Sequence, residues 1–343
     1  MVTAEDPSPG RADRSSVVRF LAEGAWPAEP PEVIETHMSW VFLTGDRAFK
    51  LKKPVVQPYL DYRTLEARRI DCEAEVALNQ PLAPTVYLGV QPLWRTGGRL
   101  GFHPDGHGEI VDWLVIMRRL HRTMMMDHRL ADGDIDPASL EQLITVLVAF
   151  YRVAPMAPVH AADYREKLLG TLEADRLELC RSEYDLDVTR VRALIARAAQ
   201  QITGSDQVAY RATRVVEGHG DLRPEHVVLG EAIPLVIDRI TFNRALRCTD
   251  PAADLALLAI ECERARAGET ADLLFNAYRR LAADDVPIAV IELYRALRAL
   301  NRARLSIAHL RGSAGDPAKW TARTEQYLTL AEAHLSDQAP AAR

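Results

Sequence analysis

The chain has 343 residues and a net charge of −6; 48% of its residues are hydrophobic and 26% are charged. These values are ordinary for a soluble globular protein, and the length is sufficient for two lobes. The acidic balance gives no reason to expect nucleic acid or an acidic membrane surface as a partner. The four cysteines form no CxxC pair, and neither a signal peptide nor a membrane-spanning apolar run is recognisable, so we expect a cytoplasmic protein.

Two lobes are expected between unstructured ends. Residues 1–15 and 337–343 are polar or rich in Ala and Pro, and we predict that they are disordered. Residues 16–117 are expected to form a small lobe rich in strands. Residues 118–336 are expected to form a larger helical lobe.

The small lobe is predicted from its apolar periodicity and its turns. The turn Thr44-Gly45-Asp46 separates two strand-like runs and predicts a hairpin. Together with a short helix and a longer one, the strands are expected to build a small mixed sheet. The predicted helices are 16–21 and 63–79, and the predicted strands are 39–43, 47–52, 86–90, 99–102 and 110–117.

The larger lobe is predicted to be helical because apolar residues recur with a helical period through most of it. The exception is a stretch of short strands around residues 213–238. The predicted helices are 137–151, 162–180, 188–201, 251–264, 271–281, 288–310 and 318–335.

Two acidic residues in that strand-rich stretch carry the chemical signal. Asp221 follows an apolar run and precedes a predicted strand, while Asp238 follows the next strand after a turn at Gly230-Glu231. Phosphoryl transfer from ATP uses such a pair, because one carboxylate orients the attacking hydroxyl and another holds Mg²⁺ on the phosphates. The spacing therefore favours a phosphotransferase over an ordinary turn.

The segment Gly218-His219-Gly220-Asp221-Leu222-Arg223-Pro224-Glu225-His226, followed by Asp238, resembles the catalytic loop and metal-binding segment of the aminoglycoside phosphotransferase branch of the protein-kinase-like fold. Other stretches look like one uncharacterised bacterial group of such proteins, often fused to a C-terminal P-loop ATP-binding domain. These stretches are 48–55, 82–90, 117–119, 242–247 and 254–259. The resemblance covers roughly residues 33–310 and implies an α+β, bilobal protein-kinase-like fold with a sheet-rich N-lobe and a larger helical C-lobe.

The resemblance implies that Asp221 is the catalytic base and that Asp238 is a ligand of Mg²⁺. His226 departs from the family, which typically has Asn five residues after the catalytic Asp. Three interpretations remain open: His226 replaces that Asn as a metal ligand, Glu225 supplies the oxygen, or the site binds metal poorly. A zinc site in the same loop would need a fourth ligand that the sequence does not identify.

Two further positions near Asp238 differ from the family. Arg239 and Thr241 stand where relatives tend to have Cys and Glu. The loss of an acid near the phosphates again bears on metal affinity.

Lys50 is the candidate for the lysine that binds the phosphates, because Ala48 precedes it in the Ala-x-Lys pattern of kinases. Lys52 lies on the same face of the predicted strand and is the alternative. Glu73, on the following helix, is the predicted ion-pair partner of this lysine. Glu75 and Glu66 are alternatives to it.

Three nucleotide contacts are predicted outside these motifs. The sequence has no GxxxxGK[ST] motif, so the chain is not a P-loop NTPase. In this fold a short loop containing Met-Ser can cover the phosphates, which makes Ser39 a candidate. The connection between the lobes is expected near residues 111–117, where backbone groups of Trp113 and Val115 would bind the adenine edge.

These features together predict an ATP- and Mg²⁺-dependent phosphotransferase that acts on a hydroxyl of a small molecule. The acceptor is expected beside residues 250–263, where Asp254, Glu261 and Glu263 could favour a cationic or polyhydroxylated molecule such as an amino sugar or an aminoglycoside. Solvent-facing helix acids explain these residues equally well. In the family Asp254 anchors the catalytic loop, and Asp250 fits a helix cap. The alternative function is a nucleotide-binding pseudokinase with a regulatory or scaffold role.

Overall fold

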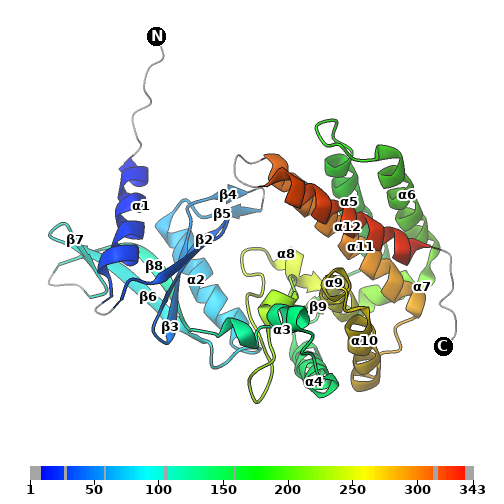
Figure 1. Ribbon diagram of the computed structural model, residues 1–343, viewed down its shortest axis with the longest axis horizontal. Coiled ribbons are helices and arrows are strands. Elements are labelled where there is room, and N and C mark those ends of the chain that lie inside the picture. The colour runs from blue at the N-terminus through cyan, green and yellow to red at the C-terminus, as the bar shows by residue number, and fades with distance from the viewer. Residues whose placement is uncertain are drawn as a thin grey trace, which may run out of the picture. The chain divides into compact units, whose positions relative to one another are not determined.

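The structure is a computed structural model that describes residues 9–26, 29–57, 59–103, 107–157, 159–311 and 316–336. The chain divides into two units, and we describe each by itself (Figure 1). The first unit comprises Met1–His121 and Ile237–Asn243, and the second comprises Arg122–Val236 and Arg244–Arg343. The chain thus leaves the first unit after His121 rather than after residue 117, and a short segment containing Asp238 returns to it. The predicted tail at 337–343 lies outside the described residues.

A six-stranded sheet forms the centre of the first unit, with strand order β1-β2-β3-β8-β6-β7. Every pair of neighbouring strands is antiparallel, so the predicted mixed sheet is wrong, while the predicted hairpin of β2 and β3 is confirmed. The elements of this unit are α1 (Pro9–Arg19), the π-helix η1 (Phe20–Gly24), β1 (Glu32–Glu35), β2 (Ser39–Thr44), β3 (Arg47–Lys52), β4 (Val56–Gln57), β5 (Leu60–Asp61), α2 (Leu65–Asn79), β6 (Tyr87–Thr96), β7 (Arg99–Gly101) and β8 (Glu109–Arg118).

The helix α1 corrects the prediction of disorder for residues 9–15, because it begins at Pro9, whereas residues 1–8 lie outside the described residues. The guanidinium of Arg14 contacts the buried carboxylate of Asp112 on β8 and the carbonyl of Lys52 on β3. Two apolar residues nearby, Val17 and Leu21, are buried against the sheet residues Phe42, Leu51, Leu93 and Leu114. These polar and apolar contacts attach the segment that contains Arg14, Val17 and Leu21 to the sheet.

The helix α2 begins after Thr64, whose hydroxyl accepts the backbone N–H of Ala67 as an N-cap. Its buried face is polar rather than apolar: the buried residues are Arg68, Asp71, Cys72, Glu75 and Asn79. Ile70, by contrast, is 54% exposed. The spacing of the buried residues is helical, so one stripe of charged groups faces the sheet.

The second unit is helical, apart from short two-residue strands, and the predicted helices are confirmed within a few residues. The helix α9 is buried without interruption from Pro251 to Cys262 and lies in the middle of the unit. The helices are α3 (Met126–Asp132), α4 (Pro137–Val153), α5 (Ala161–Leu179), α6 (Val188–Gly204), α7 (Asp206–Tyr210), α8 (Arg244–Arg247), α9 (Pro251–Arg264), α10 (Gly268–Ala282), α11 (Ile288–Ile307) and α12 (Pro317–Leu335). The 3-10 turns are η2 (Arg122–Met124), η3 (Arg211–Arg214), η4 (Pro224–His226) and η5 (Ala308–Arg311). The strands are β9 (Val216–Glu217), β10 (Val227–Val228), β11 (Leu235–Val236) and β12 (Cys248–Thr249).

The predicted α+β class, with a sheet-rich first lobe and a larger helical second lobe, is confirmed. The strands β10 and β11 pair as an antiparallel hairpin, as the sequence predicts for the stretch between Asp221 and Asp238. No helix among the described residues is long and apolar enough to cross a bilayer.

Candidate active site

Lys50 of β3 lies at the centre of an ion cluster in the first unit. Its Nζ is 2.8 Å from Oε1 of Glu75 on α2 and 2.8 Å from Oδ1 of Asp238. Burial alone would lower the pKa of Lys50, but the two carboxylates outweigh it and raise that pKa well above its usual value. The Asp238 side chain is 47% exposed, so the cluster is open to solvent on that side. The result is a permanently charged ammonium group beside an accessible carboxylate.

Lys52 is enclosed by the same cluster. Its Nζ lies 2.5 Å from Oε2 of Glu75 and also contacts Asp71, and its side chain is 5% exposed. Glu75 therefore bridges two lysines, with one oxygen for each. Lys52 has no route to a ligand in this arrangement, and Lys50 is the lysine that contacts Asp238.

The predicted partner Glu73 is corrected to Glu75. Glu73 is 52% exposed, and its carboxylate accepts a hydrogen bond of 2.6 Å from Arg69 one turn earlier on α2. Glu75 lies two positions further along the helix, which is enough to turn its side chain from the solvent face to the sheet face. Glu75 pairs with Lys50, and Glu73 does not, because the two residues lie on opposite faces of α2.

The segment that carries Asp238 is fastened to α2 and β6. The backbone N–H of Asp238 donates to the hydroxyl of Tyr87 (3.0 Å), and that of Arg239 donates to Oδ1 of Asn79 (2.8 Å). Thr241 donates its hydroxyl to Asp71 (2.8 Å). Asp238 has a φ of +60°, a left-handed conformation that few residues other than glycine adopt and that is often held at functional sites. The backbone of Arg239 and the hydroxyl of Thr241 therefore hold this segment against α2.

Ser39 does not present a phosphate contact. Its backbone N–H donates to Oγ1 of Thr36 (3.0 Å), its hydroxyl lies 3.0 Å from the same atom, and the residue is 3% exposed. The predicted role of Ser39 is therefore corrected to closing the turn between β1 and β2.

The structure places Trp113 and Val115, the predicted adenine contacts, inside a strand rather than in the connection between the lobes. Both residues lie inside β8, which is hydrogen-bonded between β3 and β6. The N–H of Trp113 donates to Asp112 (2.9 Å), and its carbonyl faces the thiol of Cys72. Val115 is fully buried and pairs with Lys50 and Val90. Backbone groups of this strand are already used, and the chain leaves the unit only after His121.

In the second unit, the loop around Asp221 is anchored by Asp254 at the start of α9. One oxygen of this buried carboxylate accepts the backbone N–H of His219 (2.7 Å), and the other accepts that of Gly220 (2.9 Å). The hydroxyl of Tyr151 also donates to it (3.0 Å). A Cβ at Gly218 would lie 2.8 Å from Oδ2 of Asp254, so only glycine fits there. The prediction that Asp254 anchors the loop is confirmed, and Asp250 caps α9 as expected.

Basic side chains surround the carboxylate of Asp221. Its Oδ2 lies 3.0 Å from Nη2 of Arg223, and its side chain is 31% exposed. Burial would raise the pKa of Asp221, but Arg223, His226, Arg302 and His219 together lower it below its usual value. Asp221 is therefore ionised at neutral pH, as a proton acceptor must be.

His226 holds the loop rather than pointing an available nitrogen at a metal. Its Nδ1 lies 2.8 Å from the carbonyl of Asp221, and its Nε2 lies 3.2 Å from Nη2 of Arg223. A carbonyl only accepts and a guanidinium only donates, so Nδ1 carries the proton and the lone pair of Nε2 is used. Ligation of a metal by His226 would require the displacement of Arg223.

The described residues contain no group of three or more His, Cys, Asp or Glu side chains that could hold a metal by themselves. Mg²⁺ does not need one, because it commonly binds through one or two carboxylates together with substrate phosphates and water. The half-exposed carboxylate of Asp238 has the oxygen donors that such a site requires. Asp238 fits Mg²⁺, whereas His226 does not.

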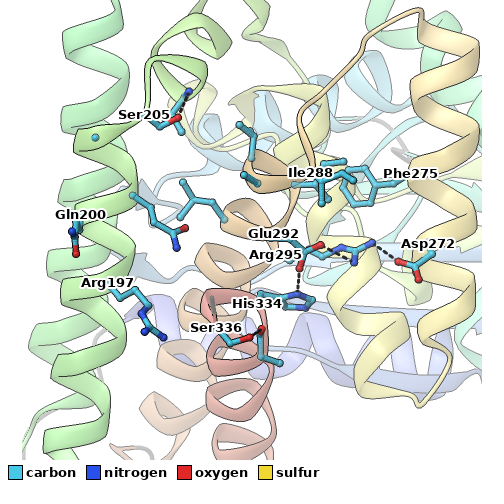
Figure 2. A pocket seen from close by; sticks show the side chains of 18 of the residues that line it. Arg197, Gln200, Ser205, Asp272, Phe275, Ile288, Glu292, Arg295, His334 and Ser336 are labelled. Atoms are coloured by element: carbon cyan, nitrogen blue, oxygen red, sulfur yellow. Dashed lines mark hydrogen bonds and ion pairs between the residues drawn. The ribbon is translucent and has the colours of Figure 1, made fainter. Parts of the chain in front are cut away.

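A cavity of about 1300 Å³ in the second unit lies apart from these residues, among α6, α10, α11 and α12 (Figure 2). None of the predicted catalytic residues lines it. On its wall, His334 places Nδ1 2.6 Å from Glu292 and Nε2 2.6 Å from Glu263. Arg295 lies beside them and contacts Asp272 (3.2 Å). The charges on this wall are mutually paired and join α12 to α9 and α11.

Comparisons with known proteins agree with this architecture. The chain is similar to a choline/ethanolamine kinase family protein from Mesorhizobium loti (15% identity, TM-score 0.54, 94% of this chain and 97% of that one). It is also similar to choline kinase from Cryptosporidium parvum Iowa II (13% identity, TM-score 0.53, 94% and 96%). A third similar structure is glucosamine kinase in complex with glucosamine, ADP and inorganic phosphate (15% identity, TM-score 0.50, 87% and 79%).

No family model matches the sequence. An uncharacterised protein of Mycobacterium tuberculosis (strain ATCC 25618 / H37Rv) is 29% identical over 309 residues. The match covers 89% of this chain and 59% of that protein, so the chain spans less than two thirds of the length of the curated relatives it matches. The structural likeness shows that the chain has the bilobal protein-kinase-like fold of the choline and glucosamine kinases, as the resemblance of its catalytic segment predicts.

Proposed function

We propose that this chain is a phosphotransferase that moves the γ-phosphoryl group of ATP, with Mg²⁺, to a hydroxyl of a small molecule. The observation that carries the proposal is the Lys50–Glu75–Asp238 cluster, in which a buried glutamate orients a lysine beside a half-exposed aspartate. A buried ion pair of this kind is costly to maintain, which favours a functional reason for it.

Each residue has one role in this proposal. The ammonium of Lys50 binds the phosphates, and Glu75 keeps it oriented. Asp238 would hold Mg²⁺, which supplies charge neutralisation on the phosphates when bound. Asp221 orients the acceptor hydroxyl. As the acceptor oxygen bonds to the γ-phosphorus and the bond to the β-phosphate oxygen breaks, the hydroxyl proton passes to Asp221 and ADP leaves.

The test is calorimetric titration with ATP, with and without Mg²⁺, on the wild type and on Asp238→Ala. The matched control is Asp46→Ala, because Asp46 is 85% exposed in the turn between β2 and β3. We expect Mg²⁺-dependent binding in the wild type and the control and its loss in Asp238→Ala. Absence of ATP binding in the wild type would refute the proposal.

A nucleotide-binding pseudokinase is the second candidate, and the position of His226 favours it. Both ring nitrogens of that residue are engaged within the loop, so His226 does not offer a ligand at the second metal position of the family. ATP binding that is indifferent to Mg²⁺ and to Asp238→Ala would support this alternative.

A further inference from the structure

One face of the helix α2 holds the segment Ile237–Asn243, which carries the proposed metal ligand. Asp71, Glu75 and Asn79 are spaced four residues apart, so their side chains lie in one row along this helix. All three residues are buried. Buried polar groups require hydrogen-bond partners, and Asp71 and Asn79 both have one in this segment.

Asn79 fixes the backbone directly after Asp238. Its Nδ2 donates to the carbonyl of Glu75 (2.9 Å), and its Oδ1 accepts the backbone N–H of Arg239 (2.8 Å). Glu75 also binds Lys50, whose Nζ contacts the carboxylate of Asp238 (2.8 Å). The carboxylate of Asp238 and the peptide bond that follows it are thus both connected to α2.

Asp71 makes the third connection, with Thr241. The hydroxyl of Thr241 donates to Oδ1 of Asp71 (2.8 Å). The other oxygen of Asp71 contacts the ammonium group of Lys52, which also binds Oε2 of Glu75 (2.5 Å). Lys52 therefore holds two neighbouring carboxylates of α2 and fixes the orientation of Asp71 toward Thr241. This contact gives a structural use to a lysine that has no route to a ligand.

These contacts stabilise an unfavourable backbone conformation at Asp238. Its φ of +60° lies in the left-handed region, which costs free energy for a residue other than glycine and persists only where the surroundings hold it. The N–H of Asp238 donates to the hydroxyl of Tyr87 (3.0 Å), and the hydrogen bonds to Asn79 and Asp71 hold the chain on its C-terminal side. Loss of one of these bonds should let the segment relax and move the carboxylate away from Lys50.

We propose that Thr241 is a positioning residue of the proposed Mg²⁺ site and that it acts through Asp71 to hold Asp238 in place. The inference rests on the proposed function and assigns a role to a position that differs from the family. A threonine where relatives tend to have an acid suggests a lost metal ligand. The hydroxyl of Thr241, however, is bound to a buried carboxylate, so a second acid there would face a like charge. The two interpretations predict opposite effects of Thr241→Glu on metal binding.

The first experiment measures how much Mg²⁺ strengthens ATP binding, as the ratio of the calorimetric dissociation constants in EDTA and in Mg²⁺. Thr241→Val removes the hydroxyl at nearly constant volume and should reduce this ratio by about fivefold or more, because fewer molecules then hold Asp238 in position. Binding of ATP in EDTA should change by less than about twofold, since the contact between Lys50 and Glu75 does not involve Thr241. Thr241→Ser keeps the hydroxyl and should retain the wild-type ratio, whereas Thr241→Glu should lower it.

The matched control is Thr145→Val. The hydroxyl of Thr145 also makes a hydrogen bond of 2.8 Å, to the carbonyl of Glu141, but it lies on α4 in the second unit. This variant should leave the ratio unchanged.

Hydrogen exchange of the ligand-free protein tests the same contact independently of nucleotide. The segment 237–243 should exchange about fivefold faster or more in Thr241→Val than in the wild type, while α4 should be unchanged. Asp71→Ala should have the same effect, and the double variant should exceed neither single variant, because both changes remove one hydrogen bond. Effects that add would show that Thr241 does not act through Asp71 and would overturn the inference.

The inference is also overturned if Thr241→Val leaves either the ratio or the exchange of segment 237–243 unchanged. A higher ratio in Thr241→Glu would overturn it as well, because the added acid would then serve as a metal ligand. A failure of the proposed function gives a different pattern, in which the wild type itself binds no ATP or binds it equally with and without Mg²⁺. That pattern overturns the inference together with the function, whereas Mg²⁺-dependent binding that is the same in the wild type and in Thr241→Val overturns the inference alone.

Discussion

Raising the pH above neutrality should loosen the attachment of α12 to the second unit, because His334 is a cation in the folded state. Its imidazole lies between the carboxylates of Glu263 and Glu292, at 2.6 Å from each, and Arg295 contacts the same two acids. Burial would lower the pKa of His334, but the two carboxylates raise it from 6.5 to about 9. A group whose folded pKa is raised contributes stability that is complete below its unfolded pKa and is lost through its folded pKa.

The magnitude follows from the two pKa values. The difference between 6.5 and about 9 corresponds to about 3 kcal/mol at about 1.4 kcal/mol per pKa unit. His334 is 11% exposed on its side chain, so solvent screening removes little of this. The loss should fall between pH 6.5 and pH 9. Asp175, whose pKa burial raises to about 6, titrates mostly below this window, and it is present in both the wild type and the His334→Gln variant.

The assay is guanidinium chloride unfolding, followed by circular dichroism at 222 nm, at several pH values from 6 to 10. His334→Gln is compared with the wild type, because glutamine can donate a hydrogen bond but cannot be protonated. We expect the stability advantage of the wild type over the variant to shrink by about 3 kcal/mol across the window. Parallel stability curves for the two proteins would refute the reasoning, as would a loss confined below pH 6.

Three further predictions concern the ion pair of Lys50 and Glu75, the loop before Asp221, and the thiol of Cys72. Glu75→Gln should weaken Mg²⁺-ATP binding by at least tenfold in calorimetry, because Lys50 loses its anchor, whereas the exposed control Glu73→Gln should stay within twofold; equal effects would contradict the assigned pair. Gly218→Ala should destabilise the protein by about 1–3 kcal/mol in denaturant unfolding, because its Cβ would clash with the carboxylate that anchors the loop; Gly170→Ala on α5, where a Cβ meets nothing within 4 Å, should be neutral or stabilising. Burial raises the pKa of Cys72 to about 12, so this thiol should resist a disulfide reagent at pH 8 in the native protein and react only after unfolding, and rapid native labelling would argue against its burial.

The helix α2 shows where prediction from the sequence reaches its limit. The predicted range 63–79 is close to the observed helix, because helix length follows from periodicity. Apolar periodicity does not locate its buried face, because four of the five buried residues are polar or charged and Ile70 is exposed. The shared helical spacing of Asp71, Glu75 and Asn79 was the available signal, since three polar residues at intervals of four lie on one stripe. Hydrophobicity alone cannot find a face that is buried by ion pairing.

Local motifs were predicted better than contacts made across the sheet. The loop around Asp221 and its anchor at Asp254 follow from the resemblance of their short motifs, although more than 30 residues separate the loop from its anchor. The prediction placed Trp113 and Val115 in the connection between the lobes, whereas the structure places them inside β8, a strand in the centre of the sheet that precedes this connection. Which of the two a residue joins depends on strand order, and that order comes from pairing between distant segments.

The return of Ile237–Asn243 to the first unit has a consequence for synthesis on the ribosome. Lys50 and Glu75 emerge early, but their third partner, Asp238, is made only after the whole of Arg122–Val236. At ordinary elongation rates that interval lasts roughly ten seconds, which is long compared with the folding of a small sheet. During it, Lys50 is paired with Glu75 but lacks the second carboxylate that Asp238 supplies. A fragment that stops at His121 would lack this carboxylate permanently, so a single cut after His121 cannot give a first lobe with its complete ion cluster.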